Sequence, residues 1–282
     1  MAKPGGGPVV VIGAGLAGLA AAVTLTRAGR DALVLERQAS PGGRVQSDMD
    51  PEGFILDRGF QVLLPAYPAA RELLDYAPLR LRAFDPGALI AGFRPMKVVS
   101  NPLARPRDVF GLLGSSPLTA ADGLRLGKLA WRVRGLQDGP VEGARERTTA
   151  GELRVLGLSL DARQQFFAPF VGGIFLDRSL QASAAWFRYV FHMLQLGGAA
   201  VPASGMSEIA VQLMGKLPPH ALRVRTEVTS IESDPSGRVI GVHAGHEPFP
   251  AASVIVATDV WAASGLVDSV ASPSPLGCTT LY

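Results

Sequence analysis

Hydrophobic and polar positions divide the chain into a β-rich beginning, a helical middle and a β-rich end. Residues 9–12 form a continuous apolar run, which is typical of a strand buried on both faces of a parallel sheet. Apolar positions then recur at helical spacing over residues 19–25, and Gly29 suits the end of that helix. A second apolar run covers residues 32–35. The order strand, turn, helix, strand predicts a βαβ unit.

The middle of the chain, from residue 65 to about residue 200, changes to helical and irregular segments. Pro117 marks the start of a predicted helix, and Thr149 with Glu152 predicts a capping box at another. Two apolar helical stretches, 160–177 and 179–198, are rich in aromatic residues. These aromatics either line a pocket or form the core of this part, and the core is favoured. They are Phe166, Phe167, Trp186, Phe187, Tyr189 and Phe191.

The predicted helix around residue 126 is amphipathic. Its apolar positions share one face, and its basic positions lie beside one another elsewhere. The apolar positions are Leu126, Leu129, Ala130, Val133 and Leu136, and the basic ones are Arg125, Lys128 and Arg132. A basic amphipathic helix can lie on a membrane surface, so peripheral membrane contact stays open. An ordinary solvated surface helix is favoured over it.

The last part of the chain returns to strand patterns. Residues 222–233, 237–245 and 253–259 predict successive strands, and the "DPSG" sequence supplies a turn after the first. "VIVATD" is a buried apolar run that ends in small polar residues, as expected for an inner strand.

Composition narrows the class of protein. With 48% hydrophobic and 18% charged residues the chain is globular, and a net charge of +3 does not favour nucleic acid as a partner. The single cysteine, Cys278, cannot form an intrachain disulfide, and no secretory signal is visible, so we expect a cytoplasmic protein. The four histidines show no metal-ligand spacing.

The turn of the βαβ unit carries the spacing of a dinucleotide site. Gly13, Gly15 and Gly18 give GxGxxG: the first permits the turn, the second lets a pyrophosphate approach, and the third lets the helix pack on the strand. Ala17 lies at the start of the same helix, whose amides would face the phosphates. Glu36 ends the second strand, 18 residues beyond Gly18, where an acid accepts hydrogen bonds from a ribose.

The segment after Glu36 distinguishes between dinucleotides. "RQASPGGR", residues 37–44, joins a glycine pair to a cation, and in this combination the sequence resembles the FAD-dependent amine oxidase and phytoene desaturase superfamily. The resemblance implies that Gly43 and Arg44 approach the FAD pyrophosphate and that Arg37 lies beside the ribose acid. It further implies that Gly59, Phe60 and Gln61 reach the flavin and that the backbone of Val228 meets the adenine. Asp57 is expected to hold its turn rather than take part in chemistry.

The resemblance implies an α/β fold with a Rossmann-like FAD-binding domain and a β-meander, into which a mainly helical α+β substrate domain is inserted. The FAD-binding domain would comprise residues 1–64 and 200–265, and the substrate domain residues 65–199. Residues 266–282 would begin a C-terminal segment that is incomplete here, so a completing polypeptide or an oligomer is a further expectation.

The implied function is that of an FAD-dependent oxidoreductase. It would transfer a hydride to flavin N5 from a small-molecule substrate, either an amine or an apolar, polyene-like and hence lipophilic molecule. Two alternatives stay open: a catalytically inert FAD- or nucleotide-binding module, and an NAD(P)-linked dehydrogenase, which would leave the glycine pair and the meander unexplained. Neither the catalytic residues nor the electron acceptor follow from the sequence.

Overall fold

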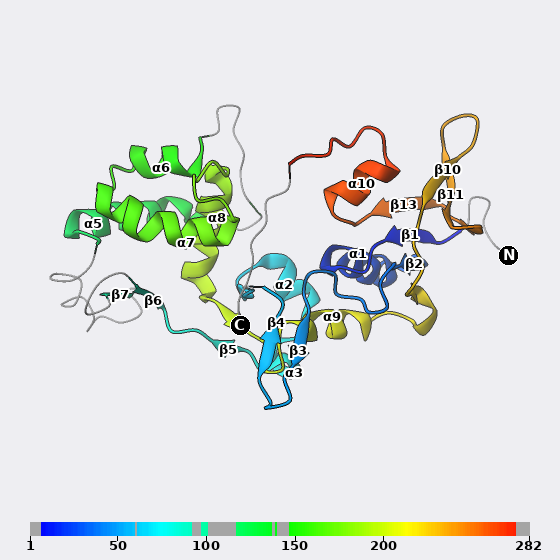
Figure 1. The fold of residues 1–282 in the computed structure, drawn as a ribbon, viewed down its shortest axis with the longest axis horizontal. Helices are drawn as coiled ribbons and strands as arrows, with labels where there is room; N and C mark the ends of the chain where they lie inside the picture. The colour runs from blue at the N-terminus through cyan, green and yellow to red at the C-terminus, as the bar shows by residue number, and fades with distance from the viewer. Residues whose placement is uncertain are drawn as a thin grey trace.

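A computed structural model describes residues 7–59, 61–91, 97–100, 117–136, 139 and 147–274. Two lobes lie side by side along the long axis of the molecule (Figure 1). The sheet lobe comprises residues 7–83 and 199–274, and the helical lobe comprises residues 117–136 and 147–197. The sheet lobe is therefore built from both ends of the described chain.

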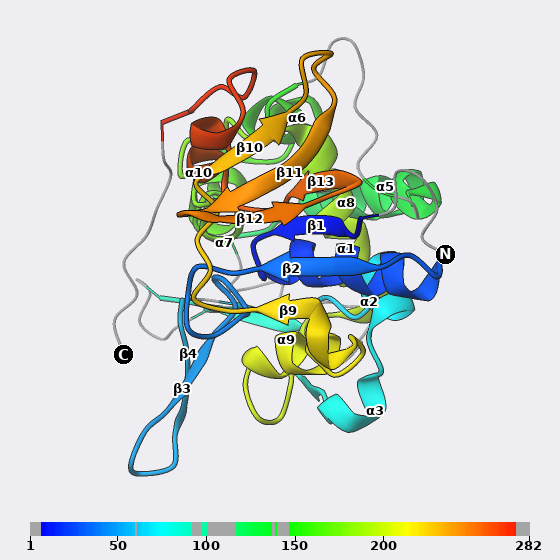
Figure 2. The same ribbon diagram turned by 90° about the vertical axis from the view of Figure 1, so that its right-hand side faces the viewer.

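A four-stranded parallel sheet forms the centre of the sheet lobe, in the order β13-β1-β2-β9. Its strands are β1 (Val9–Ile12), β2 (Ala32–Leu35), β9 (Leu222–Arg223) and β13 (Ser253–Val256). Figure 2 shows them side by side. In register, Val9 lies between Ala32 and Ser253. Because β1 has a strand on each side and a layer on each face, all of its residues are buried, as its continuous apolar run predicts.

Helices cover one face of this sheet. α1 (Leu16–Arg27) and α9 (Ser207–Met214) pack together on Val11 and Val34, and α2 (Pro68–Leu73) and α3 (Tyr76–Leu79) join the same cluster. Leu79 of α3 is buried there. Residues 68–79 therefore pack with the sheet lobe, although they follow its first strands by more than thirty residues.

A β-meander covers the other face. It consists of β10 (Ser230–Ser233), β11 (Val239–Ala244) and β12 (Glu247–Pro250), which are antiparallel in that order. Val242 and Phe249 pack against Val10 and Ile12 of the sheet. The helix α10 (Val260–Leu266) follows β13.

Two details of the strand predictions are wrong. Residues 222–233 do not form one strand: Leu222 and Arg223 pair with β2, whereas Ser230–Ser233 belongs to the meander. Between them Arg225 adopts a left-handed backbone conformation, with φ of 52°, which interrupts the strand. The prediction also omits β12, whose sequence EPFP contains two prolines. β12 lies at the edge of the meander, where proline is tolerated.

The helical lobe has a hydrophobic core of its own. Its elements are α5 (Ala120–Arg132), η2 (Val133–Gly135), α6 (Thr149–Val155), the π-helix η3 (Ala162–Phe167), α7 (Ala168–Phe175) and α8 (Ala184–Gly197). The core interpretation of the aromatics is confirmed for most of them: Phe167 and Phe187 are buried in it, and Phe166 and Phe191 pack against it. Trp186 is instead exposed on α8.

Helix caps in this lobe differ from the prediction. α5 begins at a capping box, in which Thr119 and Asp122 bond to one another's backbone N–H groups. The predicted box at Thr149 is wrong by one residue, because Thr148 is the cap and accepts a hydrogen bond from the N–H of Gly151. The Thr149 hydroxyl instead donates to the carbonyl of Ala182.

Short paired strands and α8 connect the lobes. β5 (Arg82–Ala83) pairs with β8 (Ala200–Val201), and Tyr189 and Met193 of α8 pack against Leu64. Two hairpins and a 3₁₀ turn complete the described elements: β3 (Ser47–Met49) with β4 (Ile55–Asp57), β6 (Gly87–Ile90) with β7 (Lys97–Ser100), and η4 (Pro219–Ala221).

The described ranges contain neither a membrane-spanning helix nor a metal-binding cluster. None of their helices combines the length and apolar character that crossing a bilayer requires. The same residues contain no group of three or more His, Cys, Asp or Glu side chains that could hold a metal ion.

Candidate FAD-binding site

The turn between β1 and α1 depends on its glycines in two different ways. Gly13 has φ of 100°, which side chains of L-residues rarely tolerate. A Cβ atom at Gly18 would lie 1.9 Å from the carbonyl oxygen of Gly13, so only glycine lets α1 pack this closely on the turn. A Cβ atom at Gly15 would meet nothing within 4 Å. The position predicted to admit a phosphate therefore faces open space.

The beginning of α1 carries no side-chain cap. Gly15 is the N-cap residue, and the first turn contains no acidic residue. The first N–H groups of a helix have no partner within the helix, and with the helix dipole they attract anions. Ala17, another predicted site residue, lies exposed in this first turn. This end of α1 therefore suits a phosphate.

The Glu36 carboxylate lies beside the same turn. It is only 7% exposed; one oxygen accepts from the N–H of Ala14 at 2.7 Å, and the other from the N–H of Gln38 at 2.8 Å. These bonds fix the carboxylate at the end of β2. Each oxygen keeps a further acceptor position for a ligand hydroxyl.

The structure brings the glycine pair to the turn between β1 and α1. The N–H of Gly42 donates to the carbonyl of Ala14 at 2.8 Å, and Gly15 and Gly42 form a parallel bridge. Gly43 has φ of 60°, and a Cβ atom there would lie 3.1 Å from the Cα atom of Gly15. Two glycine-containing segments thus meet, and a ligand can approach the backbone of both.

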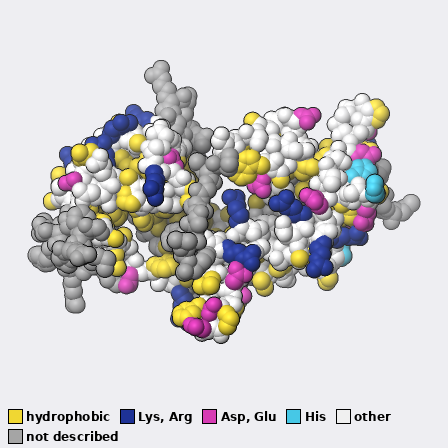
Figure 3. All heavy atoms as spheres, in the orientation of Figure 1, with side chains coloured by type: hydrophobic (Ala, Val, Ile, Leu, Met, Phe, Trp, Pro, Cys, Tyr) yellow, Lys and Arg dark blue, Asp and Glu magenta, His cyan; other side chains and the backbone are white. Residues whose placement is uncertain are grey.

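Two unpaired cations flank this junction. Arg37 and Arg44 are exposed, and neither side chain forms an ion pair or hydrogen bond with any other residue that the structure describes. In Figure 3, Lys and Arg side chains gather in the middle of the visible face, over the region of α1 and the segment after β2. Guanidinium groups free of partners beside a helix N-terminus can neutralise a pyrophosphate.

The segment predicted to reach the flavin lies next to the glycine pair. The Gln61 side-chain amide donates to the carbonyls of Arg44, at 2.8 Å, and Arg58, at 2.7 Å, which ties it to the loop after Gly43. Its oxygen is buried and has no partner among the described residues. Gly59 adopts φ of 94°, consistent with the predicted glycine turn. Phe60 lies outside the described residues.

Asp57 forms hydrogen bonds to two other segments of the chain, in addition to its expected place at the turn. One of its carboxylate oxygens accepts from the Ser47 hydroxyl at 2.5 Å and from the N–H of Met206 at 2.8 Å. The N–H of Ser207 donates to the same hydroxyl of Ser47 at 3.0 Å. Asp57 and Ser47 therefore join the β3–β4 hairpin to the start of α9.

The Val228 segment lies near the Glu36 end of the site. The N–H of Thr226 donates to the Glu36 carbonyl, and the N–H of Arg225 to the Gln38 carbonyl. Val228 itself is partly buried against the cluster that contains Leu35. Residues from both ends of the chain thus converge on one edge of the sheet.

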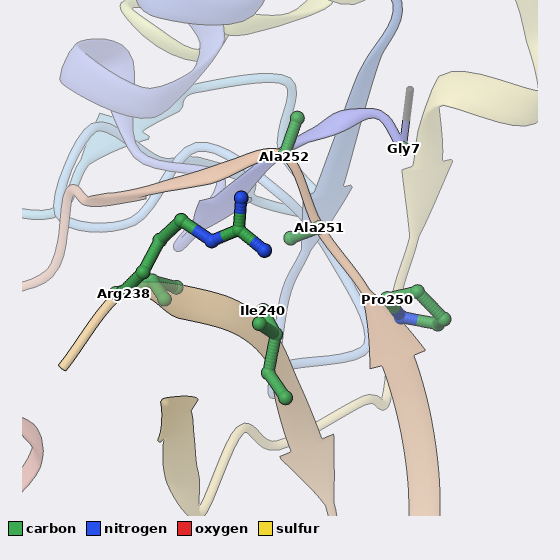
Figure 4. Close-up of a pocket in the computed structure, with 7 residues that line it drawn as sticks. Gly7, Arg238, Ile240, Pro250, Ala251 and Ala252 are labelled. Carbon is green, nitrogen blue, oxygen red and sulfur yellow. The ribbon is translucent and has the colours of Figure 1, made fainter. Parts of the chain in front are cut away.

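A separate shallow pocket lies away from this site. It is lined by Gly7, Arg238, Val239, Ile240, Pro250, Ala251 and Ala252, and Figure 4 shows the Arg238 side chain lying over its residues. Gly7 comes before β1, whereas the glycine turn follows β1. The pocket is consequently at the opposite end of that strand from the candidate site.

Two backbone contributions to the site were missed by sequence reasoning. The Ala14 N–H donates to the Glu36 carboxylate, and the Ala14 carbonyl accepts a hydrogen bond from the N–H of Gly42. Alanine carries no chemical signal, and only its place between Gly13 and Gly15 indicates that its backbone is central to the turn.

The family model described as flavin containing amine oxidoreductase matches residues 16–278. The chain belongs to this family. Its cofactor is FAD, and the residues fit that cofactor. The site offers open space at Gly15, a helix without a side-chain cap, and two arginines and a Gln61 oxygen that have no partner in the part of the chain that the structure describes.

Curated members of related families match shorter parts of the chain. A phytoene dehydrogenase of Streptomyces griseus is 54% identical over 55 residues, which is 20% of this chain and 11% of the relative. A hydroxysqualene dehydroxylase of Rhodopseudomonas palustris is 46% identical over 65 residues, or 23% of this chain and 16% of the relative. Protoporphyrinogen oxidase 2 of Arabidopsis thaliana is 28% identical over 169 residues, which is 58% of this chain and 32% of the relative.

Solved structures share the fold over most of the chain. An oxidoreductase from Methanosarcina mazei superposes with a TM-score of 0.70 at 20% identity, covering 94% of this chain and 62% of that one. A putrescine oxidase bound to putrescine gives a TM-score of 0.66 at 21% identity, covering 92% of this chain and 60% of that one. This chain therefore spans less than two thirds of the length of these proteins, and their parallel sheet matches its own.

Proposed function

We propose that this chain is the FAD-binding and substrate-facing part of an oxidoreductase that removes a hydride from a substrate C–H bond. The observation that carries the proposal is the meeting of Gly15, Gly43 and Glu36 at the end of β1 and β2. Bound FAD would supply the chemistry by accepting the hydride at N5.

Each residue of the site has a separate part in this proposal. The α1 N–H groups, Arg37 and Arg44 would bind the pyrophosphate, while Glu36 would accept hydrogen bonds from the adenosine ribose. The backbone of Val228 would meet the adenine. Gly59, Phe60 and Gln61 would approach the flavin, where the buried oxygen of Gln61 still lacks a donor among the described residues. The chain would thus bind and orient the cofactor rather than supply a nucleophile.

The proposed domain division follows the two lobes. Residues 1–64 and 200–265 would bind FAD, residues 65–199 would form the substrate domain, and residues 266–282 would begin a further segment. The packing of α2 and α3 with the sheet lobe favours moving the first boundary from residue 64 toward residue 84. The separate core of the helical lobe supports its assignment as the inserted domain.

The substrate proposal is a small molecule, either an amine or an apolar polyene-like compound. The short matches to a phytoene dehydrogenase and a hydroxysqualene dehydroxylase, both at 46% identity or more, support the apolar class. The putrescine oxidase likeness, at 21% identity, bears on the fold alone.

The test compares the purified chain with two variants. Glu36→Gln replaces one carboxylate oxygen with an NH2 group, which cannot accept a hydrogen bond from a backbone N–H or from a ribose hydroxyl. We therefore expect FAD affinity to fall about tenfold or more. Glu72→Gln, at an exposed acid of α2 outside the proposed site, is the matched control and should leave FAD affinity unchanged. Visible spectra and FAD titration provide the measurement.

Reduction experiments separate the open alternatives. Anaerobic bleaching of bound FAD by an amine or a polyene supports the oxidoreductase. An FAD complex that no such compound reduces favours the inert binding module. Tight NAD(P) binding without any flavin would contradict the proposal outright.

A further inference from the structure

The outward face of α5 carries two large apolar side chains that no described residue covers. Leu124 is 73% exposed and Trp131 is 70% exposed, the highest exposures among the large hydrophobic residues that the structure describes. They are seven positions apart, which places them on the same side of the helix, two turns from one another.

This face is opposite to the apolar face that the sequence indicates. Leu129 and Val133 are buried in the core of the helical lobe, and Leu126 and Leu136 pack against that core. The predicted apolar face therefore points inward and is not available to a partner. Leu124 and Trp131 do not serve the core, and their exposure needs a different explanation.

Basic side chains accompany these two residues. Lys128 lies between them on the helix, and Arg132 and Arg134 follow; all three are exposed, and none forms an ion pair with a described residue. The one acid of α5, Asp122, is buried and engaged with Thr119 and Ser159. The outward face thus combines apolar and positive character with no exposed acid.

The segment that packs beside the beginning of α5 adds further exposed basic and apolar side chains. The Ser159 N–H donates to Asp122 at 2.8 Å, which holds the segment after α6 against the beginning of α5. Arg154, Val155 and Leu160 are exposed there, together with one acid, Asp161. In Figure 3, dark blue Lys and Arg side chains alternate with yellow hydrophobic ones along the upper left edge of the helical lobe.

We propose that the outward face of α5, defined by Leu124, Lys128, Trp131 and Arg132, docks the protein on a membrane surface that contains anionic lipids. Trp131 and Leu124 would enter the interface between headgroups and acyl chains, where an indole ring is favoured. Lys128 and Arg132 would extend along the helix toward the anionic headgroups. The exposed charges of α5 itself are all positive, and this complementarity favours an anionic lipid surface as the partner.

The β3–β4 hairpin provides a contrasting surface. Its tip exposes Met49, at 67%, and Phe54, at 63%, which is close to the exposure of the α5 residues. Asp48, Asp50 and Glu52 accompany these two residues, however. An anionic bilayer would repel this tip, so exposed apolar area alone does not account for the proposed docking.

The experiment measures flotation of the purified full chain with phosphatidylcholine vesicles, with and without about 30% phosphatidylserine. We expect binding to the anionic vesicles, which weakens as salt is raised. Leu124→Ser with Trp131→Ser should weaken it by about tenfold or more. Lys128→Gln with Arg132→Gln should weaken it by about tenfold and reduce its salt dependence.

Met49→Ser with Phe54→Ser is the matched control and should bind the vesicles as the unchanged protein does. Circular dichroism verifies that each variant folds, which is expected because all substituted side chains are exposed. In a variant with Trp186→Phe and Trp261→Phe, the fluorescence of Trp131 should shift to the blue on anionic vesicles and be quenched by brominated lipid.

Three results would overturn the proposal. One is the absence of binding to anionic vesicles; another is equal loss of binding in the hairpin variant and the α5 variant. The third is a concentration-dependent dimer in sedimentation that the α5 variant abolishes while no vesicle binding occurs, because the face would then contact a second copy of this chain.

Discussion

At the scale of single residues, Gly15 and Gly18 allow fold and cofactor binding to be separated. A Cβ atom at Gly18 would overlap the Gly13 carbonyl, whereas one at Gly15 would project into open space. We predict that Gly18→Ala lowers the free energy of unfolding by several kcal/mol. Gly15→Ala should leave that free energy within about 1 kcal/mol and weaken FAD binding at least about tenfold.

Urea unfolding of the apoprotein and FAD titration test this pair. If Gly15→Ala binds FAD as well as the unchanged protein does, the phosphate does not lie at that position. If Gly18→Ala unfolds at the same urea concentration, the close approach of α1 to the turn is unimportant.

Asp122 makes stability depend on pH in the acid range. Burial opposes ionisation, but hydrogen bonds from Ser159 and Thr119 outweigh it and lower the pKa of Asp122 from 3.8 to about 2. A depressed pKa contributes stability that is present above the unfolded value and lost as pH falls through the folded value. The contribution, about 2 kcal/mol, should therefore be complete above pH 4 and disappear toward pH 2.

Asp122→Asn removes this ionisation. We expect the variant to be less stable than the unchanged protein by about 2 kcal/mol at pH 7, with the difference shrinking between pH 4 and pH 2. Urea unfolding at several pH values measures it. A difference that stays constant across this range would contradict the ionic explanation.

At the scale of elements, one hydroxyl joins the β3–β4 hairpin to α9. The Ser47 hydroxyl donates to Asp57 and accepts from the N–H of Ser207. Ser47→Ala leaves both partners short of a bond, so we predict a loss of about 1–3 kcal/mol in the free energy of unfolding. Ser269→Ala, at an exposed residue whose side chain forms no hydrogen bond with another described residue, should change it by less than about 0.5 kcal/mol. If the two variants are equally stable, the Ser47 hydroxyl does not stabilise the link between the hairpin and α9.

The sequence predicts elements well where one physical signal dominates. The continuous apolar runs of β1 and β2 and the glycines between them determine their structure locally. The break at Arg225 is different, because pairing with Glu36 and Gln38, nearly two hundred residues earlier, decides where β9 ends. Tertiary contacts of this kind leave no trace in local periodicity.

The α5 helix illustrates the same limit. Periodicity correctly identifies which residues face the core, since Leu129 and Val133 are buried. Periodicity does not identify Leu124 and Trp131 as a surface, because two isolated apolar residues on a polar face form no repeating pattern. Only the exposed area in the structure distinguishes them.

At the scale of the whole molecule, the separate cores predict separate responses to mutation. Leu129 is almost fully buried in the helical lobe, away from the glycine turn. Leu129→Ala should lower the free energy of unfolding by about 2–5 kcal/mol while FAD affinity changes less than about twofold. Val11→Ala, in the sheet beneath α1, should lower both stability and FAD affinity. Loss of FAD from the Leu129 variant would indicate that the lobes are tightly coupled.

The candidate site was predictable in part for a similar reason. Gly13, Gly15, Gly18 and Glu36 lie within one βαβ unit, so spacing alone indicates their proximity. The contact of Gly42 with Ala14 and the approach of the Val228 segment depend on how distant segments pack. Family resemblance supplied the positions of Gly43 and Val228, periodicity did not, and neither indicated the contact of Gly42 with Ala14.

The order of strands in the central sheet has a consequence for synthesis of the protein. β1 leaves the ribosome first, yet one of its two neighbours, β13, lies about 240 residues later in the chain. The helical lobe, whose contacts are more local, can reach its folded state while β1 still has an open edge. Until β13 has been synthesised, one edge of the apolar strand β1 remains unpaired. A nascent chain paused before residue 253 is thus the form of this protein most exposed to aggregation and most in need of a chaperone.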